Sequence, residues 1–360
     1  TGGAAIGPLV GGFLLEHFWW GSVFLLNVPV MLIVLTAGIA LLPESRNPAG
    51  NRIDLPSAAL SVLTIVPIVY AIKHVAGSGF DASVALTAAL GLAAGIVFVR
   101  RQRRLSHPLV DVSLFKVPAF AGAVAAETIA IFAFIGLLFF FSQYLQLVRG
   151  LSPLQAGLIE LPATLASLAV IAIAGFVLAR LGRGRAIAVG MLTSAAGLGL
   201  LAAAEGASGY LLLCVAIAVC GLGAGLSTTL ATDAVVSAVP KERAGAASSV
   251  SETAYELGVA LGIAVLGSLQ VALYRTNLDL PTTLPQSLGA AVEDSLAGAA
   301  AALEQGPLPA DAAADIMTTA QHAFTQAMQV TSVVAALLLV VSAIVAWRTI
   351  PSPLRKDTAR

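Results

Sequence analysis

The chain has 360 residues, of which 58% are hydrophobic and only 11% are charged, and its mean hydropathy is +0.93. A soluble domain carries roughly 25% charged residues, so this composition excludes a soluble protein and indicates a membrane protein. The formal net charge is zero, which gives no support to nucleic-acid binding, and the two cysteines, Cys214 and Cys220, form no CxxC pair and are interpreted as packing residues.

The first apolar stretch, GGAAIGPLVGG, repeats glycine too regularly for a loop. Small residues at helical spacing make a smooth face on which a neighbouring helix can approach closely. The predicted packing face consists of Gly3, Gly7, Gly11 and Gly12. Pro8 interrupts the helical hydrogen bonds, so we expect it to bend this helix. The stretch lacks the basic start of a signal peptide, and we expect the chain to be the C-terminal portion of a longer, transporter-like protein.

A membrane-spanning helix needs about 20 mostly apolar residues, and ten segments of the chain approach that length. These segments are residues 1–16, 21–42, 55–73, 83–100, 119–147, 153–180, 186–204, 209–238, 245–273 and 327–348. If the loop after the second segment is cytoplasmic, alternate loops hold 16 of the 19 Lys and Arg, and only Lys73, Arg149 and Arg275 lie outside. This asymmetry follows the positive-inside rule. It predicts an all-α, multi-pass protein of the cell membrane with a cytoplasmic C-terminus.

Five carboxylates lie inside predicted spans, where a charge costs roughly 2.5–3.5 kcal/mol near the helix centre, so each is a functional candidate. They are Glu127, Glu160, Asp233, Glu252 and Glu256. Glu127 is early in its span, and the alternative for it is that it reaches the cytoplasmic interface. Glu160 lies about 10 Å from the external end of its helix, at 1.5 Å per residue. Asp233 lies near Lys241 and Arg243, and simple pairing there is the alternative.

Glu252 and Glu256 are four residues apart and therefore share one helix face. We expect the pair to bind and release a proton, or to exchange it for a cationic drug, as a coupled unit. A protonated Glu that hydrogen-bonds a neighbouring helix is the alternative. The same helix carries Gly258, Gly262 and Gly267, which repeat the spacing of the first stretch. Matching features in two halves are typical of transporters built from repeated bundles, although such spacing is also common in other membrane helices.

Residues 274–326 form a long loop on the external side that is rich in Ala and carries six acidic residues. We expect short amphipathic helices in this loop. Its acidic side chains either attract cations or form a solvated face, and the sequence leaves both interpretations open.

Several motifs together resemble one known family. GGAAIGPLVGG followed by WWGSVFLLNVP resembles the glycine-proline antiporter motif in the fifth helix of major facilitator superfamily drug exporters. HPLVDVSLFK, YLQLVRGLSPLQAGLIELP and GAASSVSETAYELGVALGIAVLGS resemble the 14-helix drug:proton antiporter branch of that superfamily. Within the branch, SETAYELG is most similar to the quaternary-ammonium and multidrug efflux group.

The resemblance implies a domain organisation with about ten transmembrane helices present of an expected fourteen, the missing four lying upstream. Residues 1–42 would form the last two helices of an N-terminal bundle, and residues 43–118 two inserted linker helices with cytoplasmic loops. Residues 119–349 would form a C-terminal six-helix bundle that includes the external loop 274–326, and residues 350–360 a cytoplasmic tail.

GFVLARLGRGR, residues 175–185, resembles the second-half copy of the family's glycine-aspartate-arginine loop motif. The matching positions are Gly175, Arg180, Gly182 and Arg183. Ala179 stands where the acidic residue of that motif would be. We therefore do not expect a salt-bridge gate at this copy, and we expect its basic residues only to keep the loop inside.

The resemblance implies a proton-coupled efflux antiporter that exports lipophilic or quaternary-ammonium cations by alternating access, with antibiotic resistance as the outcome and Glu252 as the first candidate for coupling. Its partners would be these small molecules, protons and the lipid bilayer. The proton gradient would be the energy source, without a cofactor, a metal or nucleic acid.

Three alternatives are kept. The first is an exporter of one endogenous metabolite or antibiotic with the same fold. The second is a membrane enzyme or a channel, which the sequence disfavours because it lacks GxSxG, HExxH and P-loop motifs and a repeated acidic ring. The third is that this chain transports nothing without the helices expected upstream.

Overall fold

The computed structural model describes residues 2–41, 54–106, 108–207, 209–240, 243–281, 284–306 and 308–351. All regular elements within these ranges are helices, as the composition predicts. Nine helical segments of the described chain are long and apolar enough to cross a membrane. A further helix, α1 (Gly2–His17), has 16 residues and covers the first predicted span. The observed helices therefore agree with the predicted set of about ten.

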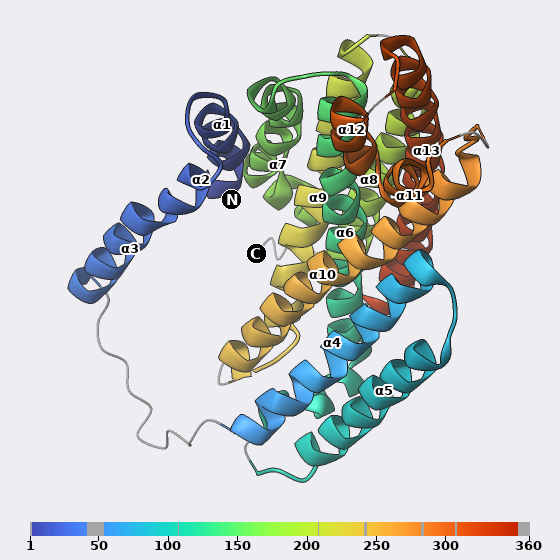
Figure 1. Ribbon diagram of the computed structural model, residues 1–360. Helices are drawn as coiled ribbons and strands as arrows, with labels where there is room; N and C mark the ends of the chain where they lie inside the picture. The colour runs from blue at the N-terminus through green and yellow to red at the C-terminus, as the bar shows by residue number, and fades with distance from the viewer. Residues whose placement is uncertain are drawn as a thin grey trace.

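Six long helices pack into one bundle (Figure 1). They are α6 (Pro118–Gln143), α7 (Pro153–Leu181), α8 (Arg183–Glu205), α9 (Leu211–Ser237), α10 (Ala244–Asn277) and α13 (Ala310–Thr349). Helix α6 contacts α9, α10 and α13, while α8 packs against α9 and α13. Two clusters of buried apolar side chains fill the bundle, one around Phe141 and Leu201 and the other around Phe120, Ile187 and Leu230.

The connection from α6 to α7 shows how local sequence ends one span and starts the next. Helix α6 continues into a π-helical turn, η2 (Tyr144–Val148), and the chain then reverses at Gly150, whose φ is +66°. The Ser152 hydroxyl accepts a hydrogen bond from the Gln155 amide at 3.3 Å, and the Gln155 side chain accepts one from the Ser152 amide at 3.0 Å. This reciprocal cap satisfies two amides that the first turn of a helix leaves unpaired. Pro153, at the first helical position, has no amide to satisfy.

Glycine allows α6 and α10 to approach each other closely. A Cβ atom at Gly258 would lie 2.7 Å from the carbonyl oxygen of Thr128, and one at Gly262 would lie 2.4 Å from that of Phe132. The approach is reciprocal, because a Cβ atom at Gly136 of α6 would lie 2.7 Å from the carbonyl carbon of Gly262. Larger residues would displace backbone at these points, so the glycines fix how α10 sits on α6.

Of the N-terminal helices, α1 lies beside α7 (Figure 1). Helix α1 contacts α7 at Gly12, where a Cβ atom would lie 2.7 Å from Leu154 Cα, whereas Cβ atoms at Gly7 and Gly11 would meet nothing within 4 Å. The close approach predicted for this glycine face is thus made at Gly12. The surroundings of Gly3 and Pro8 lie outside what the structure describes. A short α2 (Ser22–Leu25) then leads into α3 (Asn27–Leu41), which has no buried residue.

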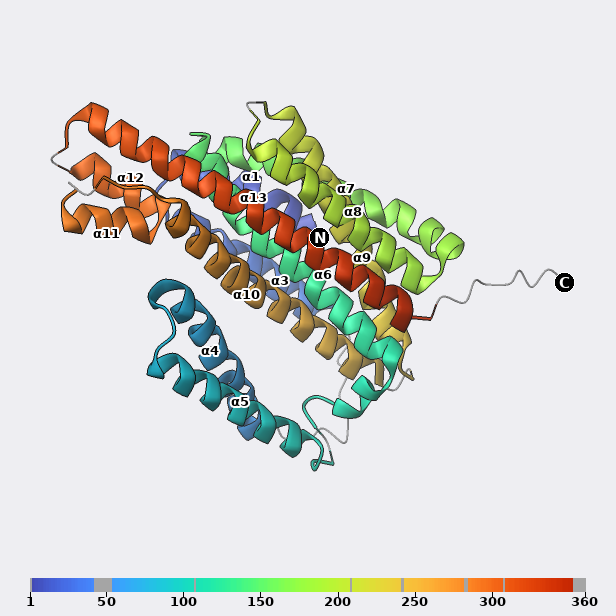
Figure 2. The ribbon, with the colours of Figure 1, turned by 90° about the vertical axis from the view of Figure 1, so that its right-hand side faces the viewer.

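Two antiparallel helices, α4 (Leu55–Ser78) and α5 (Ala82–Gln102), pack on each other, and α4 rests against α10 (Figure 2). The Arg101 guanidinium is 2.8 Å from the carboxylate of Asp54, the residue that caps α4. A short 3-10 helix, η1 (Val112–Lys116), connects α5 to α6. The pair occupies the residues for which the resemblance predicts two inserted helices.

The long loop predicted at residues 274–326 contains two short helices, α11 (Gln286–Asp294) and α12 (Leu296–Gln305), at the end of the bundle opposite the last turn of α13 (Figure 2). One boundary differs from the prediction. The last helix begins at Ala310, far ahead of the apolar span predicted at 327–348, and it has 40 residues. At 1.5 Å per residue it is about 60 Å long, roughly twice the hydrocarbon thickness, so its polar first half extends beyond the membrane.

Candidate functional site

A buried carboxyl, Glu127, lies where α6, α9 and α10 meet. Glu127 is 3% exposed. Its Oε1 accepts a hydrogen bond from Thr232 Oγ1 of α9 at 2.7 Å, and its Oε2 accepts one from Ser251 Oγ of α10 at 2.6 Å. The partners lie 105 and 124 residues further along the chain, so only the packed bundle creates this site. The interface position considered for Glu127 is therefore incorrect.

The chemistry of this site is that of a protonatable carboxyl held by rotatable donors. A hydroxyl both donates and accepts, so Thr232 and Ser251 can turn to suit either a carboxylate or a carboxylic acid. Within the described residues no basic side chain pairs with Glu127. Burying a charge without a partner is costly, which favours the neutral acid while the site stays closed. The arrangement can hold a proton and would release it when the three helices separate.

Glu252 and Glu256 lie next to this site but on the exposed face of α10. Glu252 follows Ser251 directly, and its charge acts on Glu127. Tyr255 lies between the two acids in the sequence of this helix. Within the described chain neither Glu252 nor Glu256 hydrogen-bonds a neighbouring helix, so the alternative of a hydrogen-bonded acid describes Glu127 and not this pair. The structure thus brings three of the five predicted carboxylates together.

The glycines of α10 hold these acids in place. Gly258 and Gly262 lie against the α6 backbone, and a Cβ atom at Gly267 would be 2.8 Å from the Phe140 ring. Because α10 cannot slide along α6 without clashes, the height of Ser251 relative to Glu127 is fixed.

Glu160 is separate from this cluster. It lies on α7, is 8% exposed and has the Ser142 hydroxyl of α6 beside it. Its Oε1 is buried without a hydrogen-bond partner among the described residues. Glu160 is seven residues inside α7, on the side of the bundle where η2 and α12 lie, so it is a second buried carboxyl near the opposite end.

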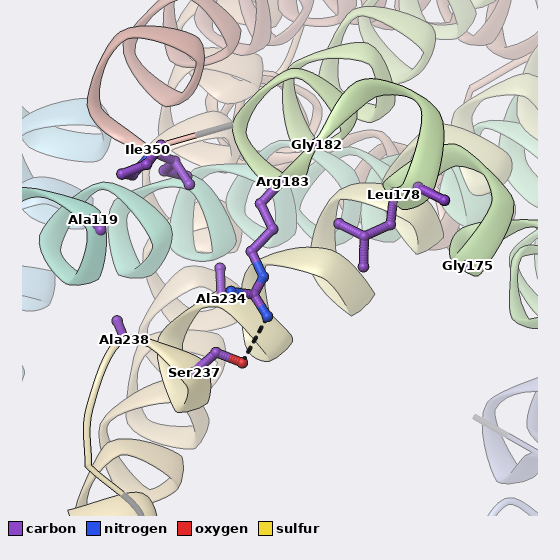
Figure 3. A pocket seen from close by; sticks show the side chains of 11 residues that line it. Ala119, Gly175, Leu178, Gly182, Arg183, Ala234, Ser237, Ala238 and Ile350 are labelled. Carbon is purple, nitrogen blue, oxygen red and sulfur yellow. Dashed lines mark hydrogen bonds between the residues drawn. The ribbon is translucent and has the colours of Figure 1, made fainter. Parts of the chain in front are cut away.

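Asp233 forms an ion pair with Arg183 at the start of α8. The Arg183 Nε atom is 3.1 Å from Asp233 Oδ2. The Arg183 Nη2 atom also donates a hydrogen bond to Ser237 Oγ at 3.0 Å (Figure 3). These contacts close one wall of a cavity of about 580 Å³ between the ends of α6, α7, α9 and α13. Arg243, considered as a partner for Asp233, instead lies 3.1 Å from Asp111. Lys241 lies outside the described residues.

This geometry corrects the expectation for the loop motif. Because Ala179 stands where the motif has its acidic residue, the loop itself offers Arg183 no carboxylate. Asp233 of α9 supplies one, so a salt bridge does form at this copy. Gly182, with φ of +75°, makes the sharp turn between α7 and α8 that positions Arg183. Arg180 points elsewhere, with its guanidinium 5.0 Å from the centre of the Phe176 ring, and Gly175 has open space beside it. Both partners of the ion pair are exposed by more than two fifths, so its energy is small, about 0–1 kcal/mol.

Sequence reasoning missed Glu205, the last residue of α8. It is 2% exposed; one carboxylate oxygen accepts from Ser332 of α13 at 3.1 Å, and the other has no partner among the described residues. Its carbonyl accepts from Tyr144, which in turn accepts from Arg149 at 2.7 Å. Glu205 falls one position beyond the predicted span 186–204. A single acid at that boundary looks like the first residue of a loop, so the sequence contained no stronger signal.

Comparisons with known proteins agree on one family. Residues 1–263 match the Major Facilitator Superfamily. The multidrug efflux pump LfrA of Mycolicibacterium smegmatis is 43% identical over 355 residues, covering 96% of this chain and 68% of the pump. The methyl viologen resistance protein SmvA of Salmonella typhimurium is 33% identical over 360 residues, 99% of this chain and 72% of that protein. A tetracenomycin C resistance and export protein of Streptomyces glaucescens is 33% identical over 355 residues, 96% of this chain and 65% of that protein.

Proposed function

Since this chain belongs to the major facilitator superfamily, in its drug:proton antiporter branch, we propose that it acts as a proton-coupled multidrug efflux antiporter. The family and the relatives indicate a multi-pass membrane transporter and not an enzyme.

The observation that carries the proposal is the Glu127 site. A transporter that exchanges a proton for a drug needs a carboxyl that is shielded in one conformation and accessible in another. Glu127 is joined by hydroxyls to two other helices of the bundle. Rocking of α9 or α10 against α6 would break one of these hydrogen bonds and admit water. Proton release would then accompany the conformational change, which is the coupling that antiport requires.

The exposed acids on α10 support cationic substrates. Glu252 and Glu256 project beside the proton site, so a bound cation and the Glu127 proton would compete electrostatically. Methyl viologen, in the name of one relative, is a flat aromatic dication, which fits such a pair of carboxylates. We therefore assign lipophilic and quaternary-ammonium cations as the substrate class, and the proton gradient as the energy source.

A second candidate function keeps the same fold but narrows the substrate. The similarity to a tetracenomycin C export protein favours an exporter of one antibiotic or metabolite. The two functions differ in the substrate range, while the proton site would be the same.

The test is transport by the complete protein in everted membrane vesicles. A pH gradient should drive uptake of a fluorescent lipophilic cation, and Glu127→Gln should abolish gradient-driven uptake because an amide cannot carry the proton. Glu252→Gln should weaken uptake of the cation. Glu304→Gln, an equal change at an exposed position of α12, is the matched control and should leave uptake unchanged.

Full gradient-driven uptake by Glu127→Gln would contradict the proposed proton site. Absence of cation uptake by folded wild-type protein, together with gradient-driven export of a single antibiotic, would favour the narrower exporter.

A further inference from the structure

A cavity of about 620 Å³ lies between α5 and α6, away from the sites described above. It is formed by the end of α5, the connection after it and η1. Its size is within the range of about 300–1,000 Å³ that is typical of small-ligand pockets. Figure 2 shows this connection at the end of the bundle opposite α11 and α12.

The charge of the cavity is positive. Arg103 and Lys116 line it and are exposed, and within the described part of the chain their side chains form no hydrogen bond or ion pair. The one acid of its lining, Asp111, is already engaged by the Ser113 hydroxyl and amide and by Arg243 at 3.1 Å. The Ser113 hydroxyl foremost, and Arg243 to a smaller extent, lower the pKa of Asp111, so this acid is ionised and already paired with Arg243. Two cationic side chains remain available to a ligand.

The wall of the cavity is held in place before any ligand arrives. The Gln102 side chain donates to Ser57 Oγ at 2.7 Å and accepts from the Val110 amide at 3.2 Å. Gln102 is 2% exposed, so this link between α4, α5 and the connection is firm. Asp111 starts η1 by accepting from the Ser113 amide at 3.0 Å. The positions of Arg103 and Lys116 therefore follow from fixed backbone on both sides.

The cavity is at the level of a membrane surface. Arg103 directly follows the span that ends at Gln102, and Lys116 precedes the span that begins at Pro118. Large apolar side chains are exposed at the same level, with Phe115 at 41% and Val117 at 42%. Basic groups beside exposed apolar side chains are the combination that binds acidic lipids at an interface.

We propose that this cavity binds the phosphate-bearing headgroup of an anionic phospholipid. Arg103 and Lys116 contact the headgroup charge, the Ser106 hydroxyl of the lining offers a further donor, and Phe115 lies beside the acyl chains. Such a lipid would join the α4–α5 pair to the six-helix bundle at this end of the molecule.

The test is native mass spectrometry of the complete protein, purified in detergent and titrated with phosphatidylglycerol. Arg103→Gln and Lys116→Gln should each weaken lipid retention about fivefold, the fold-change that corresponds to ~1 kcal/mol per basic residue at an anionic surface. Arg103→Lys keeps the charge and should retain most of the lipid. Arg348→Gln is the matched control, because it removes one exposed charge at the end of α13, outside the cavity, and it should retain lipid like the wild type.

The proposal is overturned if phosphatidylcholine is retained as well as phosphatidylglycerol, or if neither cavity variant loses lipid. Equal losses in Arg348→Gln would show bulk electrostatic attraction and would also overturn it. Displacement of the lipid by glycerol 3-phosphate at equal concentration would show a site for a soluble anion, and not for a lipid.

Discussion

At the scale of single residues, the Glu127 site depends on the two hydroxyl groups that donate hydrogen bonds to its carboxyl. Thr232 and Ser251 each donate a hydrogen bond to one oxygen of the Glu127 carboxyl, which is 3% exposed. An unsatisfied buried group costs about 1–3 kcal/mol. The hydroxyls therefore contribute both to the stability of the bundle and to holding the proton.

Thr232→Val and Ser251→Ala should each lower the free energy of unfolding by about 1–3 kcal/mol and should change the pH profile of transport, because each leaves one Glu127 oxygen without a donor. Thermal unfolding in detergent and transport at several pH values are the measurements. Thr253→Val is the control, since that exposed hydroxyl bonds only the Ser249 carbonyl of its own helix. Variants with the stability and pH profile of the control would show that the hydroxyls have no such role.

A second residue-scale effect concerns Asp81, which caps α5. Hydrogen bonds from the Val84 amide, the Ser83 hydroxyl and His74 lower the pKa of Asp81 from 3.8 to about 2. A lowered pKa means that the cap is fully present above pH 3.8 and is lost as the pH falls toward 2. At neutral pH, Asp81→Ala should speed hydrogen exchange in the first turn of α5. The difference from the wild type should shrink below pH 4, and a difference that stayed constant down to pH 2 would argue against an ionised cap.

The sequence predicts the buried acids of the site but not the side chains that hydrogen-bond them. The cost of charge in a membrane identified Glu127, Glu160 and the acids of α10 as candidates. Their partners could not be predicted, because Thr232 and Ser251 reach Glu127 only through helix packing. Arg183 is the clearest case: the local motif lacked its acid, and the acid came from 50 residues away.

At the scale of elements, the α6–α10 contact is the most specific packing in the bundle. Three glycines of two helices meet there backbone to backbone, and each would place a Cβ atom within 2.7 Å of the other helix. Close packing of this kind stabilises the helix pair in lipid, where the hydrophobic effect between helices is weak. It also ties the height of Ser251 to that of Glu127.

Gly262→Ala should destabilise the protein and reduce transport, because the new methyl group would lie 2.4 Å from the Phe132 carbonyl oxygen and the two backbones must separate. Gly245→Ala on the same helix is the matched control, since a Cβ atom there meets nothing within 4 Å. We expect a cost of about 1–3 kcal/mol for Gly262→Ala, typical of overpacking, and none for the control. Thermal unfolding measures both, and equal melting temperatures would mean that the contact is not tight.

At the scale of elements, the sequence predicted the bounds of a helix well only where the apolar run was long enough to span a membrane. Long apolar runs such as 119–147 and 153–180 set the spans well, because hydropathy alone decides them. The start of α13 was missed because residues 310–326 are polar and mixed, and their helix is set by contact with α12 and η2 outside the membrane.

At the scale of the whole molecule, buried carboxyls lie at two levels of one bundle. Glu127 is about 14 Å from the start of α6, and Glu160 is about 10 Å from the start of α7, which enters from the opposite end. Each is nearer to a different side of the membrane. In alternating access, the Glu127 level would open toward the side of the basic loops and the Glu160 level toward the other side.

Binding of a cation should expel the Glu127 proton. This is measured as proton release by the complete, purified protein in weakly buffered solution when methyl viologen is added. The wild type should release protons, Glu127→Gln should release none, and Glu252→Gln should release them only at higher cation concentration. Undiminished release by folded Glu127→Gln would mean that the exchanged proton belongs to another group and that Glu127 is not the coupling site.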